Sequence, residues 1–138
     1  MNYDYSITFI GTFIALVTLF VQALVAATSK AKQPGAVPGK ISDSLSHDSF
    51  VFRAHRTFMN SLENMPLFLG SVFLGMFAGA HPRWLGIFVV VYALARIVHM
   101  VLYYAIATEK NPSPRSYFFG IALLAQIGIL GLVGATLI

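Results

Sequence analysis

Four long apolar segments follow one another along the chain, and short polar or proline-containing segments separate them. Each apolar segment is close to the roughly 20 residues that a helix needs to cross the hydrocarbon core of a bilayer. Prolines and glycines in the intervening segments cannot continue a helix. We therefore predict helices over residues 5–30, 49–79, 83–108 and 115–137, in a single domain that spans residues 1–138.

Polar side chains interrupt two of these segments at intervals that match helical turns. The second segment carries them at offsets of 0, 3, 7 and 10, which share one helical face at about 100° per residue. The third segment carries them at offsets of 0, 3 and 7. An ionisable group at membrane depth is costly, so we expect the two stripes to face each other and to form the functional site. Their residues are Arg53, Arg56, Asn60 and Glu63, and then Arg96, His99 and Tyr103.

Composition supports a membrane protein. Apolar residues make up 57% of the chain and charged residues 10%, and the mean hydropathy is +0.75. A soluble domain carries about a quarter charged residues. The pattern predicts an all-α integral membrane protein, a four-helix bundle with left-handed up-down topology.

The distribution of positive charge predicts the orientation. The first and third loops hold most of the lysines, whereas Arg83 alone lies on the opposite side. By the positive-inside rule these two loops are cytoplasmic and both termini lie on the other side. Both polar stripes then fall in the cytoplasmic half of the membrane. The loop residues are Lys30, Lys32, Lys40, Lys110 and Arg115.

The residue types of the stripes favour an anionic ligand. Guanidinium groups match carboxylates through paired hydrogen bonds, and Glu63 could receive an ammonium group. A structural role is the alternative for each residue singly, since an Arg–Glu pair can hold helices together and Arg53 can extend to the interface. Arginines around one histidine disfavour a metal site, the absence of cysteine excludes a thiol nucleophile of the protein's own, and no basic run indicates nucleic-acid binding.

Small residues indicate close helix packing. Gly75 and Gly79 form a GxxxG pattern, and Gly128, Gly131 and Gly134 recur along the fourth segment. Small residues let membrane helices approach one another. Packing within the chain is the ordinary interpretation, and contact between subunits is the alternative.

The polar stripes resemble those of the MAPEG family, the membrane-associated proteins in eicosanoid and glutathione metabolism. The resemblance is carried by Arg-x-x-Arg-x-x-x-Asn-x-x-Glu over residues 53–63, by Arg-x-x-His-x-x-x-Tyr over residues 96–103 and by Pro-Arg-Ser at residues 114–116. It is closest to the branch of microsomal glutathione transferases and prostaglandin E synthases. Met59 stands where the synthases carry an arginine, which favours a general transferase.

The resemblance implies a homotrimer that binds glutathione between subunits as co-substrate, with a lipophilic second substrate arriving from the membrane lipid. Arg115 and Ser116 would be catalytic and would lie near the glutathione thiol. Transfer to electrophiles and reduction of hydroperoxides are both implied activities. The glutathione-binding residues would be Arg53, Arg56, Asn60, Glu63, Arg96, His99, Tyr103 and Lys30.

Two other functions compete with this interpretation. A non-catalytic protein of the same fold would bind lipid or a lipophilic ligand without forming a thiolate. A small four-helix multidrug exporter would carry its essential carboxylate in the first membrane span, and residues 6–28 contain none. The sequence therefore favours the transferase.

Overall fold

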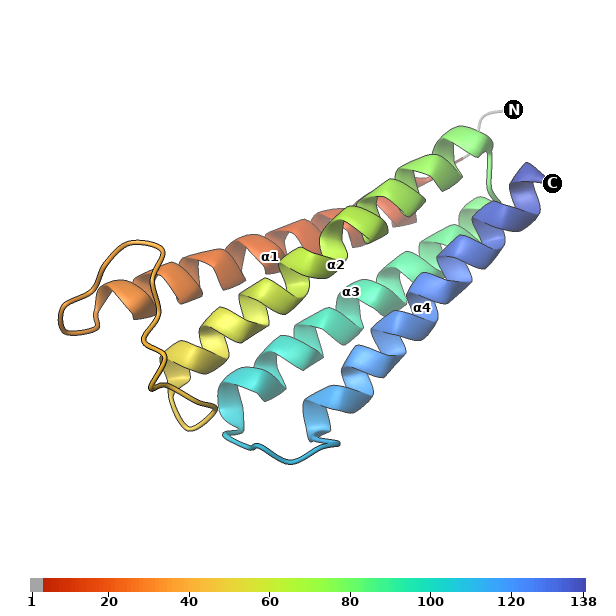
Figure 1. Ribbon diagram of the computed structural model, residues 1–138. Coiled ribbons are helices and arrows are strands. Elements are labelled where there is room, and N and C mark those ends of the chain that lie inside the picture. Colours follow the sequence, from red (N-terminus) through yellow and green to blue (C-terminus); the bar gives the residue numbers. More distant parts are fainter. Residues whose placement is uncertain (1–3) are drawn as a thin grey trace.

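The computed structural model describes residues 4–138, which form four α-helices and no strand (Figure 1). All four are long and apolar enough to cross a membrane. The prediction of an all-α, multi-pass membrane protein is therefore confirmed. The helices are α1 (Ser6–Ala31), α2 (Phe50–Ala78), α3 (Pro82–Ala105) and α4 (Pro114–Leu137).

The third helix is shorter than predicted, since it ends at Ala105 and not near residue 108. Ile106 takes an extended backbone conformation (φ −115°, ψ 113°) while its N–H still donates to the carbonyl of Leu102. Beyond it, the Thr108 hydroxyl accepts the N–H of Lys110. Such local side-chain bonds compete with helix continuation, and the apolar pattern alone did not reveal them.

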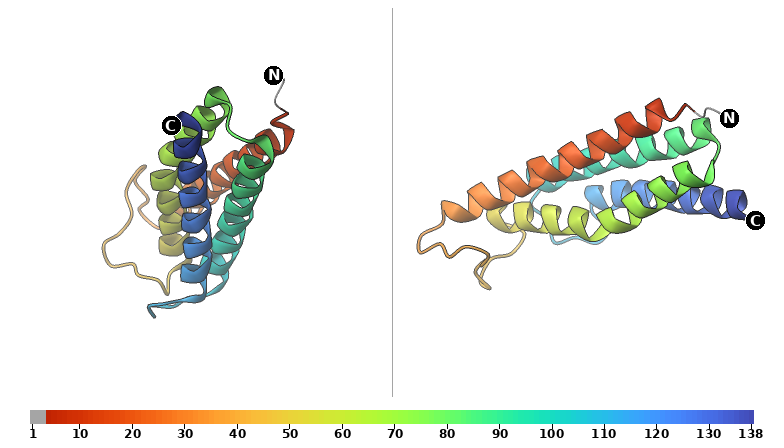
Figure 2. Two further views of the ribbon diagram at one scale, coloured as in Figure 1. Left: turned by 90° about the vertical axis from the view of Figure 1, so that its right-hand side faces the viewer. Right: turned by 90° about the horizontal axis from the view of Figure 1, so that it is seen from above.

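The helices run alternately up and down, so that the first and third loops lie at one end, and the start of α1 and the end of α4 lie at the other (Figures 1 and 2). Helices α2 and α3 contact each other and each of the outer helices, whereas α1 and α4 share no contact within residues 4–138. The two helices that carry the polar stripes are thus the central pair. We refer below to the end with the first and third loops as the loop end.

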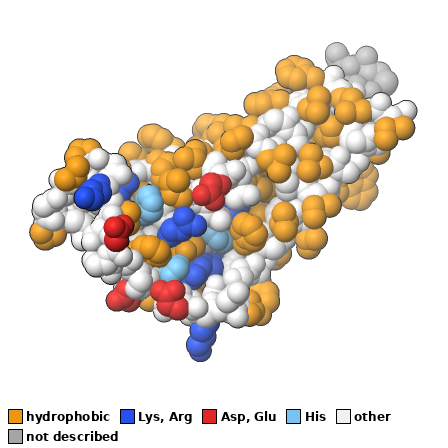
Figure 3. Space-filling view, in the orientation of Figure 1, with side chains coloured by type: hydrophobic (Ala, Val, Ile, Leu, Met, Phe, Trp, Pro, Cys, Tyr) orange, Lys and Arg blue, Asp and Glu red, His pale blue; other side chains and the backbone are white. Residues whose placement is uncertain are grey.

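Large apolar side chains cover the outside of the bundle (Figure 3). Phe13, Phe77 and Leu124 are 66%, 88% and 68% exposed. An outward-facing apolar surface of this extent suits contact with lipid tails and not with water. It agrees with the assignment of all four helices as membrane spans.

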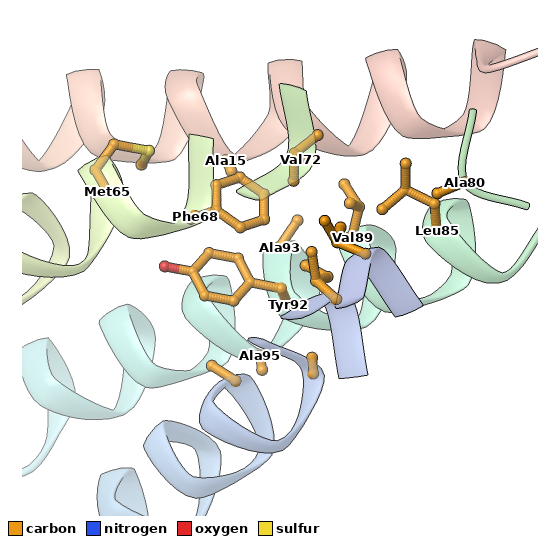
Figure 4. Close-up of a cluster of buried hydrophobic side chains, with 14 residues drawn as sticks. Ala15, Met65, Phe68, Val72, Ala80, Leu85, Val89, Tyr92, Ala93 and Ala95 are labelled. Atoms are coloured by element: carbon orange, nitrogen blue, oxygen red, sulfur yellow. The ribbon is translucent and has the colours of Figure 1, made fainter. Parts of the chain in front are cut away.

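An apolar core joins the helices further from the loop end (Figure 4). The rings of Phe68 on α2 and Tyr92 on α3 stack with centroids 4.0 Å apart and planes 9° apart. Gln126 on α4 donates to the hydroxyl of Ser71 on α2 at 2.8 Å. These contacts hold α2, α3 and α4 together next to the polar residues, on the side away from the loop end.

The small residues serve different purposes. Gly128 lies so close to Phe88 that an added Cβ would meet ring atoms at 2.7–2.9 Å, whereas Gly131 and Gly134 have open space beside them. Gly79 takes a positive φ of 79° and ends α2, so only Gly75 of the GxxxG pattern packs within a helix. Packing within the chain therefore explains Gly75 and Gly128.

Candidate functional site

Most basic and histidine side chains gather at the loop end of the bundle. Figure 3 shows Lys, Arg, His and acidic side chains together on one face there, while apolar side chains cover the remainder of that face. The up-down arrangement places the first half of α2, the second half of α3 and the start of α4 at this level. Both predicted stripes and Arg115 come from these parts of the helices.

Arg96 is the centre of the contact between α2 and α3. Its guanidinium donates to Asn60 Oδ1 at 2.7 Å and to Ser61 Oγ at 2.8 Å. The side chain is only 4% exposed, and its Nε has no hydrogen-bond partner among the described residues. One of its nitrogens is therefore fixed by α2, while the remaining donors are available to another group. Ser61 is a partner that the sequence analysis did not identify.

A small cavity of about 40 Å³ lies beside Arg96, between α2, α3 and α4. Tyr92 and Gln126 are among the side chains that line it. Pockets that enclose small ligands usually measure about 300–1,000 Å³. The cavity beside Arg96 is therefore too small to enclose a ligand of that size.

His99 lies one turn after Arg96 and is 3% exposed. Its ring meets that of Tyr103 edge-on, with centroids 5.6 Å apart. The Nδ1 atom is buried and has no hydrogen-bond partner among residues 4–138. His99 thus adds a buried polar atom that a ligand or a second subunit could satisfy.

Tyr103 and Arg115 form a contact between the third helix and the start of the fourth. The Arg115 guanidinium carbon lies 4.1 Å from the centroid of the Tyr103 ring. This is a cation–π arrangement, which is stronger where water is scarce. It places the guanidinium over the ring, and the N–H donors of Arg115 make no hydrogen bond to the described residues.

Two loop residues that the sequence analysis did not place in the site complete this region. His47 Nε2 lies 2.8 Å from the Tyr103 hydroxyl, and His47 Nδ1 lies 2.9 Å from Glu109 Oε2. The backbone N–H of His47 also donates to Glu109 Oε1 at 3.0 Å, which lowers the pKa of the Glu109 carboxyl. Both loops were predicted to lie on one side of the membrane, and that was the only signal in the sequence for their meeting.

Arg53 belongs to the same region but makes structural contacts. Its NH1 donates to the carbonyls of His47 and Asp48 at 2.8 and 3.1 Å, and its NH2 donates to the carbonyl of Tyr104 at 3.3 Å. Only its Nε lacks a partner. These bonds fasten the end of the first loop to the end of α3. They favour a positioning role for Arg53 over direct ligand binding.

Ser116 is engaged at the start of α4. Its hydroxyl accepts the backbone N–H of Ser113 at 3.1 Å, and the two hydroxyls are 3.1 Å apart, which forms a capping box. Capping of this kind satisfies backbone donors that the first helical turn leaves open. Ser116 therefore orients the turn that carries Arg115.

The remaining predicted residues lie further from this cluster. Arg56 is half-buried and Glu63 is exposed on α2, and neither makes a hydrogen bond or ion pair to the described residues. Lys30 lines a different pocket of about 650 Å³, formed by the end of α1 and the first loop. The structure thus brings together Asn60, Arg96, His99, Tyr103 and Arg115, and leaves Arg56, Glu63 and Lys30 outside their contacts.

The electrostatics of the region favour an anionic ligand. The only salt bridge in the described part of the chain joins His47 to Glu109. Arg56, Arg96 and Arg115, all at one end of the bundle, therefore have no carboxylate paired with them among the described residues. Within residues 4–138 no group of three metal-ligating side chains is found.

Comparison with known proteins gives one match. The model of the MAPEG family matches residues 7–135 of the chain. No curated protein and no solved structure matches significantly.

Proposed function

Because the chain belongs to the MAPEG family, we propose that it is a membrane-bound glutathione-dependent transferase or peroxidase, which activates the glutathione thiol against lipophilic electrophiles or hydroperoxides. The proposal is carried by one observation. Guanidinium groups of α2, α3 and α4 gather at the loop end, and none forms a salt bridge within the described residues. Glutathione carries two carboxylates, one ammonium and a thiol, and its negatively charged groups suit this cluster of guanidinium groups.

The unused hydrogen-bonding groups of the site suggest which residues bind glutathione. Arg96 retains unused donors beside Asn60, and Arg56 makes no hydrogen bond or ion pair to residues 4–138, so these two are the natural contacts for the carboxylates. Glu63 is exposed on the same helix and suits the ammonium group. His99 offers its buried Nδ1.

Thiol activation falls to Arg115. A free thiol has a pKa of about 8.5, so only a small part is thiolate at neutral pH. A guanidinium beside the sulfur favours the anion, more so where water is scarce. Arg115 lies over the face of Tyr103, and its N–H donors make no hydrogen bond to the described part of the chain, which leaves them available to a thiolate.

The reaction then starts from the thiolate. In conjugation, the sulfur electron pair attacks an electrophilic carbon of a substrate that enters from the bilayer, and the leaving group departs with its electron pair. In peroxide reduction, the sulfur attacks one peroxide oxygen and the alkoxide takes a proton to give the alcohol. The thiol of a second glutathione then attacks the oxidised sulfur, which forms glutathione disulfide and releases water. Neither reaction needs a thiol from the protein.

We also propose that the site lies between subunits of a homotrimer, with its ligand side in the cytoplasm. Arg56 and Glu63 make no hydrogen bond or ion pair to the described residues, and the cavity beside Arg96 holds only about 40 Å³. A neighbouring subunit would enclose a ligand that lies across the outer face of the bundle. All Lys and Arg residues except Arg83 belong to the loop end, which supports the cytoplasmic orientation.

The test is titration of purified protein in lipid nanodiscs with glutathione, followed by ultraviolet difference absorbance of the thiolate. We expect a thiolate signal at neutral pH that saturates with glutathione and is absent with S-methylglutathione. Binding without a thiolate would favour the non-catalytic alternative. A lack of binding would contradict the proposal as a whole.

A further inference from the structure

His47 and Glu109 connect three segments that are distant in the sequence. His47 lies in the loop between α1 and α2, Tyr103 in the last turn of α3, and Glu109 in the loop before α4. The path runs from Tyr103, which is 7% exposed, through the His47 side chain at 19% to that of Glu109 at 66%. The site proposed above makes no use of His47 or Glu109, so this chain of bonds requires its own explanation.

The chemistry of the three side chains determines which of them donates each hydrogen bond. A carboxylate only accepts hydrogen bonds, so His47 carries a hydrogen on Nδ1 and donates it to Glu109. In the neutral imidazole, Nε2 is then an acceptor, and the Tyr103 hydroxyl donates to it at 2.8 Å. Glu109 also accepts a hydrogen bond from the backbone N–H of His47. The carboxylate therefore holds His47 both by its backbone and by its imidazole ring.

These bonds act on Arg115 through the Tyr103 ring. A phenol that donates its hydrogen to an imidazole becomes richer in electrons, and its face then attracts a cation more strongly. The imidazole and phenol rings are also nearly parallel, 21° apart with centroids separated by 5.7 Å. The bond to His47 fixes the position of the phenol oxygen, so the ring cannot swing away from His47 without breaking that bond, and the Arg115 guanidinium lies over the ring.

We propose that His47 and Glu109 are positioning residues that hold Tyr103, and through its ring the Arg115 guanidinium, in place for activation of the glutathione thiol. This inference rests on the proposed function. It assigns to the first and third loops a direct part in setting the thiolate fraction. An arginine that lies beside the sulfur only part of the time stabilises the thiolate less.

The direction in which Glu109→Gln shifts the pKa of the bound thiol distinguishes positioning by Glu109 from a direct electrostatic effect of its charge. Glu109→Gln keeps an oxygen that can accept the His47 N–H, but it removes the negative charge that fixes the imidazole. If Glu109 acted only as a nearby negative charge, its removal would lower the pKa of the bound thiol. If it positions Arg115, its removal raises the pKa of the bound thiol. The expected rise is about one pH unit, which is a tenfold change in the ionisation constant of the bound thiol.

The experiment is a pH titration of the thiolate absorbance of bound glutathione in wild type, Glu109→Gln, Tyr103→Phe and the double variant. Asp43→Asn is the matched control, because Asp43 is an exposed carboxylate of the first loop outside the chain of bonds. We expect each single variant to raise the titration midpoint and the double variant to raise it no further. Wild-type behaviour is expected of Asp43→Asn.

The outcomes are distinguishable. A raised midpoint in Glu109→Gln with unchanged glutathione affinity supports positioning. A lowered or unchanged midpoint, or additive effects in the double variant, overturns the inference and leaves the proposed function intact as long as wild type forms the thiolate. Wild type that forms no thiolate removes the proposed function and this inference together. Since Glu109 is exposed, the variant is expected to fold, and far-ultraviolet circular dichroism checks this.

Discussion

The guanidinium of Arg96 donates to the side-chain oxygen of Asn60 at 2.7 Å, and this bond joins the two polar stripes at their centre. Asn60→Ala removes one of the two acceptors of a buried cation. We expect a loss of about 1–3 kcal/mol in stability, because a buried donor then lacks its partner. Glutathione should also bind roughly tenfold more weakly, as about 1.4 kcal/mol of positioning would be lost.

Asn64→Ala is the control for this change. Asn64 lies one turn further on α2 and donates to the backbone carbonyl of Asn60, not to Arg96. Thermal unfolding in nanodiscs and isothermal titration with glutathione measure both effects. Equal losses in the two variants would show that the Arg96–Asn60 bond has no particular importance.

Arg115→Ala should lower turnover far more than glutathione affinity. The guanidinium rests on Tyr103 and donates no hydrogen bond to the described residues, so its removal leaves the fold largely unchanged. Loss of one donor that stabilises a developing anion costs about 10²–10³ in rate. The measurement is kcat against a lipophilic electrophile, together with the dissociation constant of glutathione.

Arg115→Lys is the informative companion to that variant. A lysine keeps the charge but loses the planar group that lies on the ring, so we expect only partial recovery of turnover. Wild-type turnover in Arg115→Ala would exclude thiol activation by this residue.

Ser116→Ala should affect stability more than catalysis. The hydroxyl closes the capping box at the start of α4, and loss of such a cap costs about 0.5–2 kcal/mol. We expect a lower Tm and at most a modest fall in kcat through loosening of the Arg115 turn. A fall in kcat as large as that of Arg115→Ala, at unchanged Tm, would instead assign Ser116 a direct part in the chemistry.

The pH dependence of stability should reveal the bond between the two loops. The pKa of Glu109 is lowered in the folded protein, first by the backbone N–H of His47. A lowered pKa means that the carboxylate stabilises the fold above its ordinary value of 4.5, and that this contribution is lost as the pH falls through the folded value. The Tm difference between wild type and Glu109→Gln should therefore be present at neutral pH and shrink below about pH 4.5.

Asp43→Asn serves as the reference for that measurement, since it removes an exposed loop carboxylate that accepts no bond from His47. The difference is expected to be small, because Glu109 is largely exposed. A Tm difference that grows towards acid pH would contradict the assigned bond.

Hydrophobic patterning was sufficient to predict the membrane class, the helices and their up-down order. Helical periodicity also predicted that Asn60 and Arg96 lie on facing helices, because the side-chain direction of a helical residue follows from its position. The bond between them is therefore a consequence of pattern and topology together. The end of α3 at Ala105 was missed, since the extended backbone at Ile106 and the hydrogen bond to Thr108 leave no periodic signal in the sequence.

The loop contacts could not be predicted in the same way. His47 meets Glu109 across 62 positions of sequence, and their meeting depends on the path of a loop with no repeating pattern. The contacts of Arg53 likewise go to backbone carbonyls, which every residue possesses and no sequence motif marks. Residue type indicated which side chains carry the chemistry, whereas their individual partners required coordinates.

Two glycines of α4 give a final prediction that separates close packing from helix propensity. A Cβ at position 128 would meet the Phe88 ring at 2.7–2.9 Å, so Gly128→Ala forces that ring to move. Overpacking of this kind costs about 1–3 kcal/mol. We therefore expect Gly128→Ala to lower the Tm.

Gly131→Ala is the matched control, because nothing lies within 4 Å of an added Cβ at that position. Alanine in an open helical position restricts the unfolded chain and is expected to be neutral or to stabilise by a few tenths of a kcal/mol to about 1 kcal/mol. Thermal unfolding of both variants in nanodiscs gives the comparison. If Gly131→Ala lowered the Tm as much as Gly128→Ala, the open face of α4 would be a subunit contact, since only a neighbouring chain could crowd the added methyl group there.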